Sequence, residues 1–264
     1  MGEALQARLQ AHGLVVPAGL TVTSSGERPD LAHLFGGDAR IWAPFMLEDP
    51  IAHEGFDVAH EAYPDFQLML LDGTERLMAR ANAMPLAWSG LDDDLPDGWD
   101  DQILRSVADR RSGVVVNTLG AMVIVVLPDQ RGAGHAGTMV GAFRAAAAAA
   151  GLSALIACVR PTEKERYPLM PIERYAAWKR ADGLPFDPWI RLHVRLGGRI
   201  VRSSPTSMTV RGSIRDWESW TGLSFPESGP YVVAGGTSPV LIDLDRDEGV
   251  YHDQNVWVVH DLTP

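Results

Sequence analysis

One short turn in this sequence combines the residue types that bind phosphate groups. It reads Arg131-Gly132-Ala133-Gly134-His135-Ala136, and a helix-forming stretch follows it. Glycine permits backbone conformations that bring successive N–H groups together on an anion, and the positive end of the helix dipole adds to the attraction. The sequence contains no Gly-x-x-x-x-Gly-Lys-Ser/Thr loop. Residues 132–137 do have the spacing Gly-x-Gly-x-x-Gly, but the acidic residue that a dinucleotide site carries about twenty positions later is missing. The turn therefore predicts a pyrophosphate site of another kind, with a simple tight turn as the alternative.

The segments on either side of this turn have the pattern of a β–α–β unit. An apolar run over residues 119–127 ends at Pro128, just before the turn. The helix that follows contains the alanine run 145–150 and stops at Gly151, and a second apolar run covers residues 152–159. Two continuous apolar strands joined by a helix are typical of a right-handed crossover between parallel, buried strands.

The spacing Arg131-x-x-Gly134-x-Ala136 resembles the Arg/Gln-x-x-Gly-x-Gly/Ala signature of the GNAT acyltransferase superfamily. The resemblance implies an α/β fold with a mixed central sheet, a splayed pair of parallel strands and flanking helices. It also implies acetyl-CoA or another acyl-CoA as co-substrate, bound where the two strands splay beyond Val125 and Cys158. The residues expected to contact the cofactor are Val123, Ile124, Val125, Arg131, Gly132, Ala133, Gly134, His135 and Ala136.

Composition is consistent with one soluble enzyme domain over residues 1–264. The chain is 46% hydrophobic, shows no internal repeat or Ser/Gly linker, and has no apolar run near the roughly 20 residues that span a bilayer. Its net charge of −11 argues against general binding to nucleic acid or to an anionic membrane. The single cysteine, Cys158, excludes an internal disulfide and is expected as a small buried residue. We expect a cytoplasmic protein, in which residues 1–64 form an N-terminal helix, a strand and the acceptor side, and residues 65–264 form the thioester-binding core.

Local patterns predict two further parts of this core. Residues 66–71 and 75–84, separated by Asp72-Gly73, predict a β-hairpin, because Asp-Gly between apolar runs favours such a turn. Asp97 is the expected N-cap of a helix that runs to about Arg111.

A basic stretch follows the phosphate turn. Residues 160–202 contain ten Arg and Lys against five Asp and Glu, a local balance of +5 in an acidic chain. Such a region suits an anionic thioester carrier, which is either CoA or the acidic face of an acyl carrier protein. A solvated helix face balanced by neighbouring acids is the alternative.

The second half of the chain resembles one GNAT branch more closely. The segments Arg160-Pro161-Thr162 and Arg191-Leu192-His193 are similar to those of stand-alone bacterial GNAT proteins and of GNAT-like loading domains in polyketide assembly lines. These domains decarboxylate malonyl-type thioesters or transfer acyl groups to a carrier-protein thiol.

In these loading domains a threonine and a histidine lie beside the thioester, and a tryptophan and an arginine shape the acyl pocket. The resemblance assigns these roles to Thr162, His193 and Trp42. The arginine should fall near Met208 or Thr209, and neither is basic. Of the nearby arginines Arg199, Arg202 and Arg211, we assign Arg211 to the substrate pocket.

Acid–base chemistry follows from these residues. A histidine ordinarily titrates near neutral pH, so we expect His193 to take a proton from an attacking amine, or to donate one to the enolate left by decarboxylation. Tyr175, with Tyr167 nearby, lies where other GNAT enzymes carry a tyrosine that protonates the leaving thiolate. For each of these residues a structural role in the core or in a cap is the alternative. The histidines lack metal-ligand spacing, so no metal is implied.

The sequence thus leaves three functions open. The first is acyl transfer from acetyl-CoA or a related acyl-CoA to a small-molecule amine. The second is decarboxylation of a malonyl-type thioester, with or without transfer to an acyl carrier protein. The third is a non-catalytic module that binds acyl-CoA. The segment 30–64 should form the acceptor side of the site, and no motif in it identifies the acceptor.

Overall fold

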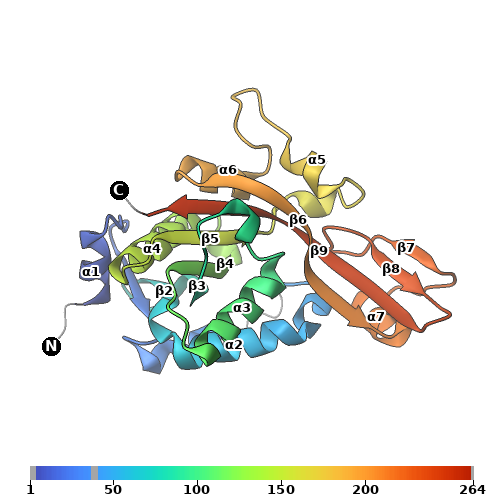
Figure 1. The fold of residues 1–264 in the computed structure, drawn as a ribbon, viewed down its shortest axis with the longest axis horizontal. Helices are drawn as coiled ribbons and strands as arrows, with labels where there is room; N and C mark the ends of the chain where they lie inside the picture. The colour runs from blue at the N-terminus through green and yellow to red at the C-terminus, as the bar shows by residue number, and fades with distance from the viewer. Residues whose placement is uncertain (1–3, 37–40, 263–264) are drawn as a thin grey trace.

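A nine-stranded mixed sheet forms the centre of the protein (Figure 1). The computed structural model describes residues 4–36 and 41–262. Eight strands follow the order β1-β2-β3-β4-β5-β9-β8-β7, and β6 pairs with β9 beside them. The strands are β1 (Leu20–Ser24), β2 (Gln67–Asp72), β3 (Leu77–Leu86), β4 (Thr118–Val126), β5 (Ala154–Val159), β6 (Arg199–Gly212), β7 (Gly229–Tyr231), β8 (Val240–Asp243) and β9 (Glu248–Asp261). This architecture confirms the expected α/β fold and the expected hairpin, which is formed by β2 and β3.

The strands β4 and β5 form the parallel pair of this sheet, and they separate partway along their length. Their register runs from Thr118↔Ala154 to Ala121↔Ala157 and stops there. The expectation that the splay begins beyond Val125 and Cys158 was therefore wrong. The cause lies on the other edge of β4, where pairing with β3 shifts between Asn82 and Ala83 and leaves Met122 as an extra residue. Such a β-bulge bends its strand, and here it accompanies the departure of β4 from β5.

Helices cover both faces of the sheet. The helices are α1 (Leu5–Ala11), α2 (Pro50–Ala62), α3 (Trp99–Ser112), α4 (His135–Ala149), α5 (Ile172–Ala176), α6 (Pro188–Arg195) and α7 (Ile214–Thr221). Small residues of β3, including Ala79 and Ala81, let α4 pack closely on one face through Phe143 and its alanines, with α1 beside it. On the other face α2 and α3 pack through Ala59 and Ile103. None of the helices in the described parts of the chain is long and apolar enough to cross a membrane.

The start of α3 is fixed by a distant strand. The N-cap is Gly98, whose side chain offers no cap, and not Asp97 as expected. The N–H of Trp99 instead donates to Ser207 Oγ on β6, 3.0 Å away. A tertiary contact thus replaces the local cap, which is why the sequence pattern placed the cap one residue early.

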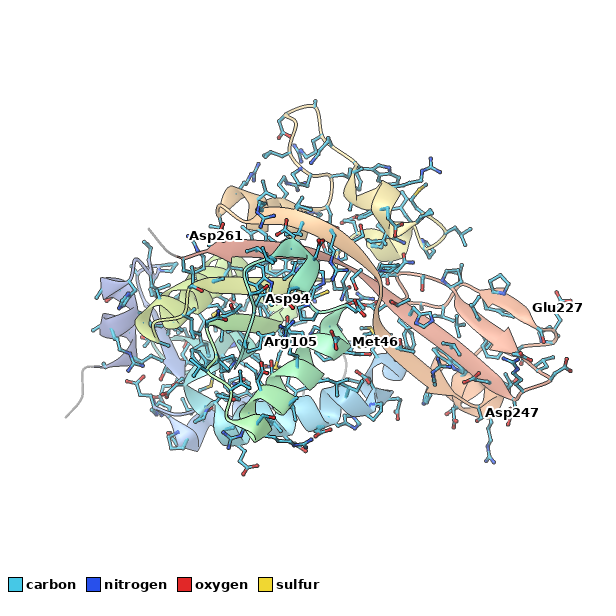
Figure 2. The ribbon with its side chains drawn as sticks, viewed as in Figure 1. Met46, Asp94, Arg105, Glu227, Asp247 and Asp261 are labelled. Atoms are coloured by element: carbon cyan, nitrogen blue, oxygen red, sulfur yellow. The ribbon has the colours of Figure 1, made fainter. Side chains whose placement is uncertain are left out.

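The long strands β6 and β9 carry the sheet beyond the helical core. In Figure 1 they extend from the core to an arm that also contains α7, β7 and β8. Glu227 and Asp247 lie at the far end of this arm, and Met46 lies between the arm and the core (Figure 2). The arm has a core of its own, in which Phe45 packs against Trp217 and Tyr251. Because β9 also pairs with β5, the arm and the splay are joined by one strand.

A buried pair of histidines joins α6 to the end of β9. His193 Nδ1 and His260 Nε2 lie 3.0 Å apart, and both side chains are almost fully buried. Burial lowers the pKa of His193 to about 3, and the nearby His260 acts in the same direction. Burial also lowers the pKa of His260 to about 4. Both rings are therefore neutral in the folded protein near pH 7.

Acid should weaken the fold through this pair. Both folded pKa values, about 3 and about 4, lie below the ordinary value of 6.5. At a pH between the folded and the ordinary value, the unfolded chain therefore binds protons that the folded chain does not. The free energy of unfolding therefore falls as the pH falls, by up to about 2 kcal/mol per histidine at pH 5. Replacing both residues (His193→Leu with His260→Leu) should reduce the change in Tm between pH 7.5 and pH 5, measured by calorimetry. An unchanged pH dependence would contradict this assignment.

The contact between Gly98 and β6 should tolerate no side chain. A Cβ at Gly98 would lie 2.4 Å from the Cα of Ser207 and 2.5 Å from its carbonyl oxygen. We expect Gly98→Ala to lower the free energy of unfolding by about 1–3 kcal/mol, as overpacked sites do. Gly141→Ala, inside α4 with Leu14 at 3.7 Å, is the matched control and should be neutral or stabilising by up to about 1 kcal/mol. Urea unfolding measures both, and equal effects would argue against the close contact.

Candidate active site

The predicted phosphate turn leads directly into α4. Gly132 and Gly134 have φ values of 86° and 85°, which favour glycine, and Gly134 is the N-cap of the helix. A cavity opens in front of this turn. Its lining includes Arg131, Gly132, Gly134, His135 and Ala136 on one side and Arg191 and Arg195 of α6 on the other. The N–H groups of the first helical turn and these guanidinium groups suit a pyrophosphate.

A second cavity of about 490 Å³ lies at the splay between β4 and β5. Thr162 and Trp189 line both cavities, so the cavity at the phosphate turn and the one at the splay adjoin at these two residues. This central cavity is also lined by Val123 and Ile124 of β4 and by Cys158 and Val159 of β5. Two strands that separate leave backbone groups free to pair with an extended ligand, which is what the pantetheine arm of CoA offers.

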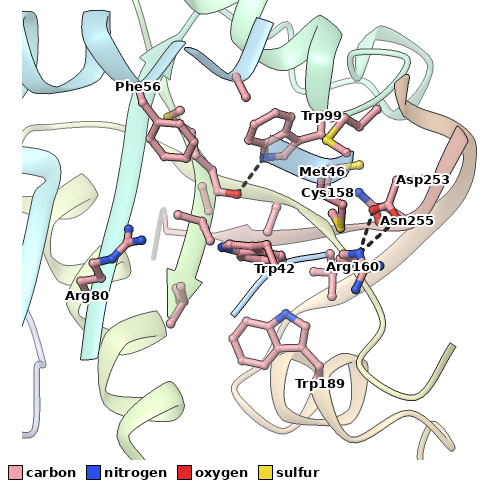
Figure 3. A pocket seen from close by; sticks show the side chains of 18 of the residues that line it. Trp42, Met46, Phe56, Arg80, Trp99, Cys158, Arg160, Trp189, Asp253 and Asn255 are labelled. Atoms are coloured by element: carbon pink, nitrogen blue, oxygen red, sulfur yellow. Dashed lines mark hydrogen bonds and ion pairs between the residues drawn. The ribbon is translucent and has the colours of Figure 1, made fainter. Parts of the chain in front are cut away.

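The far wall of the central cavity comes from the N-terminal segment, and it is rich in aromatic rings. Trp42 and Phe56 face the centre of the cavity from this wall, while Arg80 of β3 lies at one end (Figure 3). The residues of this segment that line the cavity are Phe35, Trp42, Met46, Leu47, Ala52, His53, Phe56 and His60. Residues 37–40, in the middle of the expected acceptor segment, lie outside the described residues.

Behind this wall the carboxyl groups of Asp49 and Asp100 affect each other's pKa. Burial raises the pKa of Asp100 to about 8, and the charge of Asp49 adds to the shift. Asp49 caps α2 by accepting from the N–H groups of Ile51 and Ala52, and Asp100 accepts the N–H of Thr209 at 2.9 Å. The pair therefore ties the start of α2, which carries part of the acceptor wall, to α3 and β6.

A bulged residue and a tryptophan meet at the centre of the cavity. The indole nitrogen of Trp99 donates to the carbonyl oxygen of Met122 at 2.7 Å (Figure 3). Met122 is the extra residue of the β4 bulge, and both side chains line the cavity. The bulge is therefore held from the α3 side by a hydrogen bond.

A buried ion pair closes the side of the cavity next to β9. Arg160 Nε lies 3.0 Å from both carboxylate oxygens of Asp253 (Figure 3), and another of its nitrogens donates to the carbonyl of Gly235 at 2.6 Å. Asp253 also accepts from Thr237 at 2.8 Å and from Tyr251 at 2.5 Å. These partners satisfy both charges, so the pair shapes this wall and leaves little net charge in it.

His193 and Thr162 both reach the central cavity, as the resemblance implied. His193 packs edge to face on Trp189, with ring centres 4.5 Å apart. Its Nε2 has no hydrogen-bond partner among the described residues. Thr162 is exposed, at the junction of the two cavities. The structure thus brings together a neutral imidazole, a hydroxyl group and the splay.

Other predicted site residues lie elsewhere. The hydroxyl of Tyr175 donates to Asp187 at 2.9 Å, and Asp187 caps α6; burial raises the pKa of this tyrosine. Arg211 is exposed near the end of β6 and pairs with Glu248 at 2.9 Å. Neither residue is part of the described lining of the two cavities, and the same holds for Val125 and Ala133. Tyr175 therefore supports α6, and Arg211 belongs to the arm.

The position expected for the pocket arginine holds Met208, which is buried and lines the cavity. The nearby arginines do not replace it. Arg199 pairs with Asp92 at 2.8 Å, and Arg202 donates to the carbonyl oxygens of Leu95 and Pro96.

Sequence reasoning missed several residues that the fold brings to the cavity. Asp253 and Asn255 gave no clear signal, because they stand in a run of four polar residues, 252–255, in which no alternation marks one face. Arg160 was counted as a charge and not as a cavity residue. Trp99 gave no signal, because its contact with Met122 depends on the packing of α3 on β4.

Comparison with known proteins gives the family. No family model matches the chain. The arginine N-acetyltransferase avaD of Aspergillus versicolor is 30% identical over 286 residues, which covers 96% of this chain and 98% of that protein.

Two solved structures share the fold. The loading GNATL domain of CurA from Lyngbya majuscula has a TM-score of 0.57 at 15% identity and covers 92% of this chain and 98% of that one. The GNAT-like decarboxylase GphF, solved with isobutyryl-CoA, has a TM-score of 0.52 at 15% identity and covers 92% of this chain and all of that one. The near-complete coverage of these proteins, the splayed strands and the phosphate turn all indicate the same family. The chain belongs to the GNAT acyltransferase superfamily.

Proposed function

We propose that this enzyme transfers an acyl group, in the first instance acetyl, from CoA to a nitrogen atom of a small molecule. The observation that carries the proposal is that the cavity at the glycine turn adjoins an aromatic cavity at Thr162 and Trp189. In this proposal the thioester lies at the splay, and the rest of the cavity holds the acceptor. The avaD relative acts on arginine, which makes arginine and related guanidino compounds the first acceptors to test.

The reaction needs one proton acceptor and one site for the developing oxyanion. The acceptor nitrogen attacks the thioester carbonyl, the C–N bond forms, and the C–S bond of the tetrahedral intermediate then breaks. The proton lost by the nitrogen ends on the CoA sulfur, and we propose that His193 passes it between the two. The support for this role is the Nε2 atom, which has no hydrogen-bond partner among the described residues and so is free to take up or give a proton.

Decarboxylation of a malonyl-type thioester is the second candidate, since Thr162 and His193 line the same cavity. Met208 argues against it, because an apolar side chain stands where the loading domains have an arginine. An enolate also needs a hydrogen-bond donor, which the Thr162 hydroxyl or the N–H of a neutral imidazole can supply, so Met208 is the observation that separates the two reactions. Amine acylation therefore fits this cavity better, with CoA rather than a carrier protein as the first donor to test.

The phosphate turn can be tested with a charge placed in it. Nothing lies within 4 Å of a Cβ at Gly134, so Gly134→Asp should fold and yet repel the pyrophosphate. We expect its affinity for CoA to fall at least tenfold, about 1.4 kcal/mol or more, by calorimetry. Gly134→Asn has the same shape and tolerates positive φ similarly, so it isolates the charge and should lose much less. If Gly134→Asp binds CoA as the parent does, the site lies elsewhere.

The role of His193 can be tested with the donor varied. With acetyl-CoA and an amine acceptor, His193→Gln should lower kcat by about 10²-fold, as loss of an acid–base group does, while CoA affinity stays within about twofold. Malonyl-CoA, and the same malonyl group on a carrier protein, should survive incubation with the parent enzyme. Intact-mass analysis and free-thiol release measure all three reactions. Release of CO₂ that disappears in His193→Gln and in Thr162→Val would support decarboxylation instead.

A further inference from the structure

We propose that Trp99 is a positioning residue for acyl transfer, because it holds the β4 bulge in the orientation that binds the carbonyl oxygen of the thioester. The inference rests on the proposed function and names a residue that acts through the backbone of Met122 and Val123. It is supported by the bulge of β4 at Met122, by the hydrogen bond from Trp99 to that bulge, and by the polar contacts that hold Trp99.

Beyond Ala121 the backbone of β4 is not paired with β5. Pairing with β5 ends at Ala121↔Ala157, so the amide groups of β4 beyond Ala121 have no partner on that strand. On the β3 side Met122 falls between two registered pairs, Ala83↔Ala121 and Asn82↔Val123. N–H groups fixed beside an acyl carbonyl in a site that excludes water are the usual means of stabilising an oxyanion.

The hydrogen bond from Trp99 fixes the direction of one of these groups. A peptide unit is planar and trans, so the carbonyl of Met122 and the N–H of Val123 point in opposite directions from one rigid plane. The indole nitrogen holds that carbonyl at 2.7 Å from the α3 side. The N–H of Val123 must then point away from Trp99, and Val123 itself lines the cavity at the splay.

Trp99 is itself held by a chain of polar contacts. Its own N–H donates to Ser207 Oγ, and Gly98 lies directly against the backbone of Ser207. Ser207 Oγ also lies 3.1 Å from Cys158 Sγ and 2.8 Å from the Asn255 amide. With its oxygen toward Ser207, that amide donates to Asp253 at 3.1 Å.

Burial raises the pKa of Cys158 to about 12, so its thiol keeps a proton to share in this chain. Trp99 is therefore braced by β5, β6 and β9 together. Support of this kind is what a precisely oriented group requires.

Trp99→Phe tests the proposal, since it removes the indole N–H and keeps an aromatic ring. We expect kcat to fall about tenfold, which corresponds to about 1.4 kcal/mol, while KM and Kd for acetyl-CoA stay within twofold. Binding to the parent should shift the stretching frequency of a ¹³C-labelled thioester carbonyl. This shift should be smaller on binding to Trp99→Phe. Trp88→Phe is the matched control, because Trp88 is a buried tryptophan that donates to the carbonyl of Leu91 at 2.9 Å, outside the described cavity lining. Trp88→Phe should change neither kcat nor the shift of the carbonyl stretch.

The outcomes separate this proposal from the proposed function. A kcat within twofold of the parent, or an equal loss in Trp88→Phe, would overturn the role of Trp99 while leaving acyl transfer in place. If the parent acylates none of the acceptors tried, the carbonyl stretch in the complex with acetyl-CoA still tests the role of Trp99. An equal shift in the parent and in Trp99→Phe would then overturn it. A parent that does not bind acetyl-CoA would overturn both. Should Trp99→Phe fail to fold, Ser207→Ala must produce the same loss of kcat at unchanged KM, and parental kinetics in that variant would count against the proposal.

Discussion

The separation of β4 from β5 is the constraint on which the rest of this structure depends. Two adjacent parallel strands that stop pairing inside a sheet leave backbone N–H and C=O groups without partners, and such groups are costly when buried. An extended ligand with amide groups of its own can satisfy them, so the gap in the sheet suits such a ligand. The bulge at Met122 and the aromatic residues around the cavity keep this gap open.

Each neighbouring element stabilises one side of that gap. The helix α4 brings its N-terminus to the phosphate end, and α6 brings His193 and Trp189 to the side of β5. The buried partners of α6 are structural. Asp187 caps the helix, accepts the hydroxyl of Tyr175 and accepts the N–H of Glu163, so it ties α6 to the turn that carries Thr162. A tyrosine that seemed suited to acid–base chemistry thus serves to fix the elements that carry other site residues.

The sequence predicted the parts of the fold that depend on local pattern. The apolar runs on both sides of the turn became β4 and β5, and Asp72-Gly73 marks the hairpin, because these signals lie within a few residues. What it could not predict depends on contacts between distant segments. The N-cap of α3 comes from Ser207, the point of splay depends on pairing with β3, and the ion pair of Arg160 with Asp253 joins β5 to β9. Arg211 illustrates the same limit: on β6 it is only three residues from Met208, yet it lies on the arm and pairs with Glu248.

The position of β9 has a consequence for synthesis on the ribosome. The glycine turn, α4 and both parallel strands are complete by Val159, but Asp253 and Asn255 enter the sheet only with the last strand. A nascent chain can therefore form the phosphate end of the site well before it can close the cavity beside it. Until β9 emerges, one edge of β5 is unpaired, and an open edge of this kind is prone to non-native pairing. For this fold, the cavity is complete only once β9 has joined the sheet.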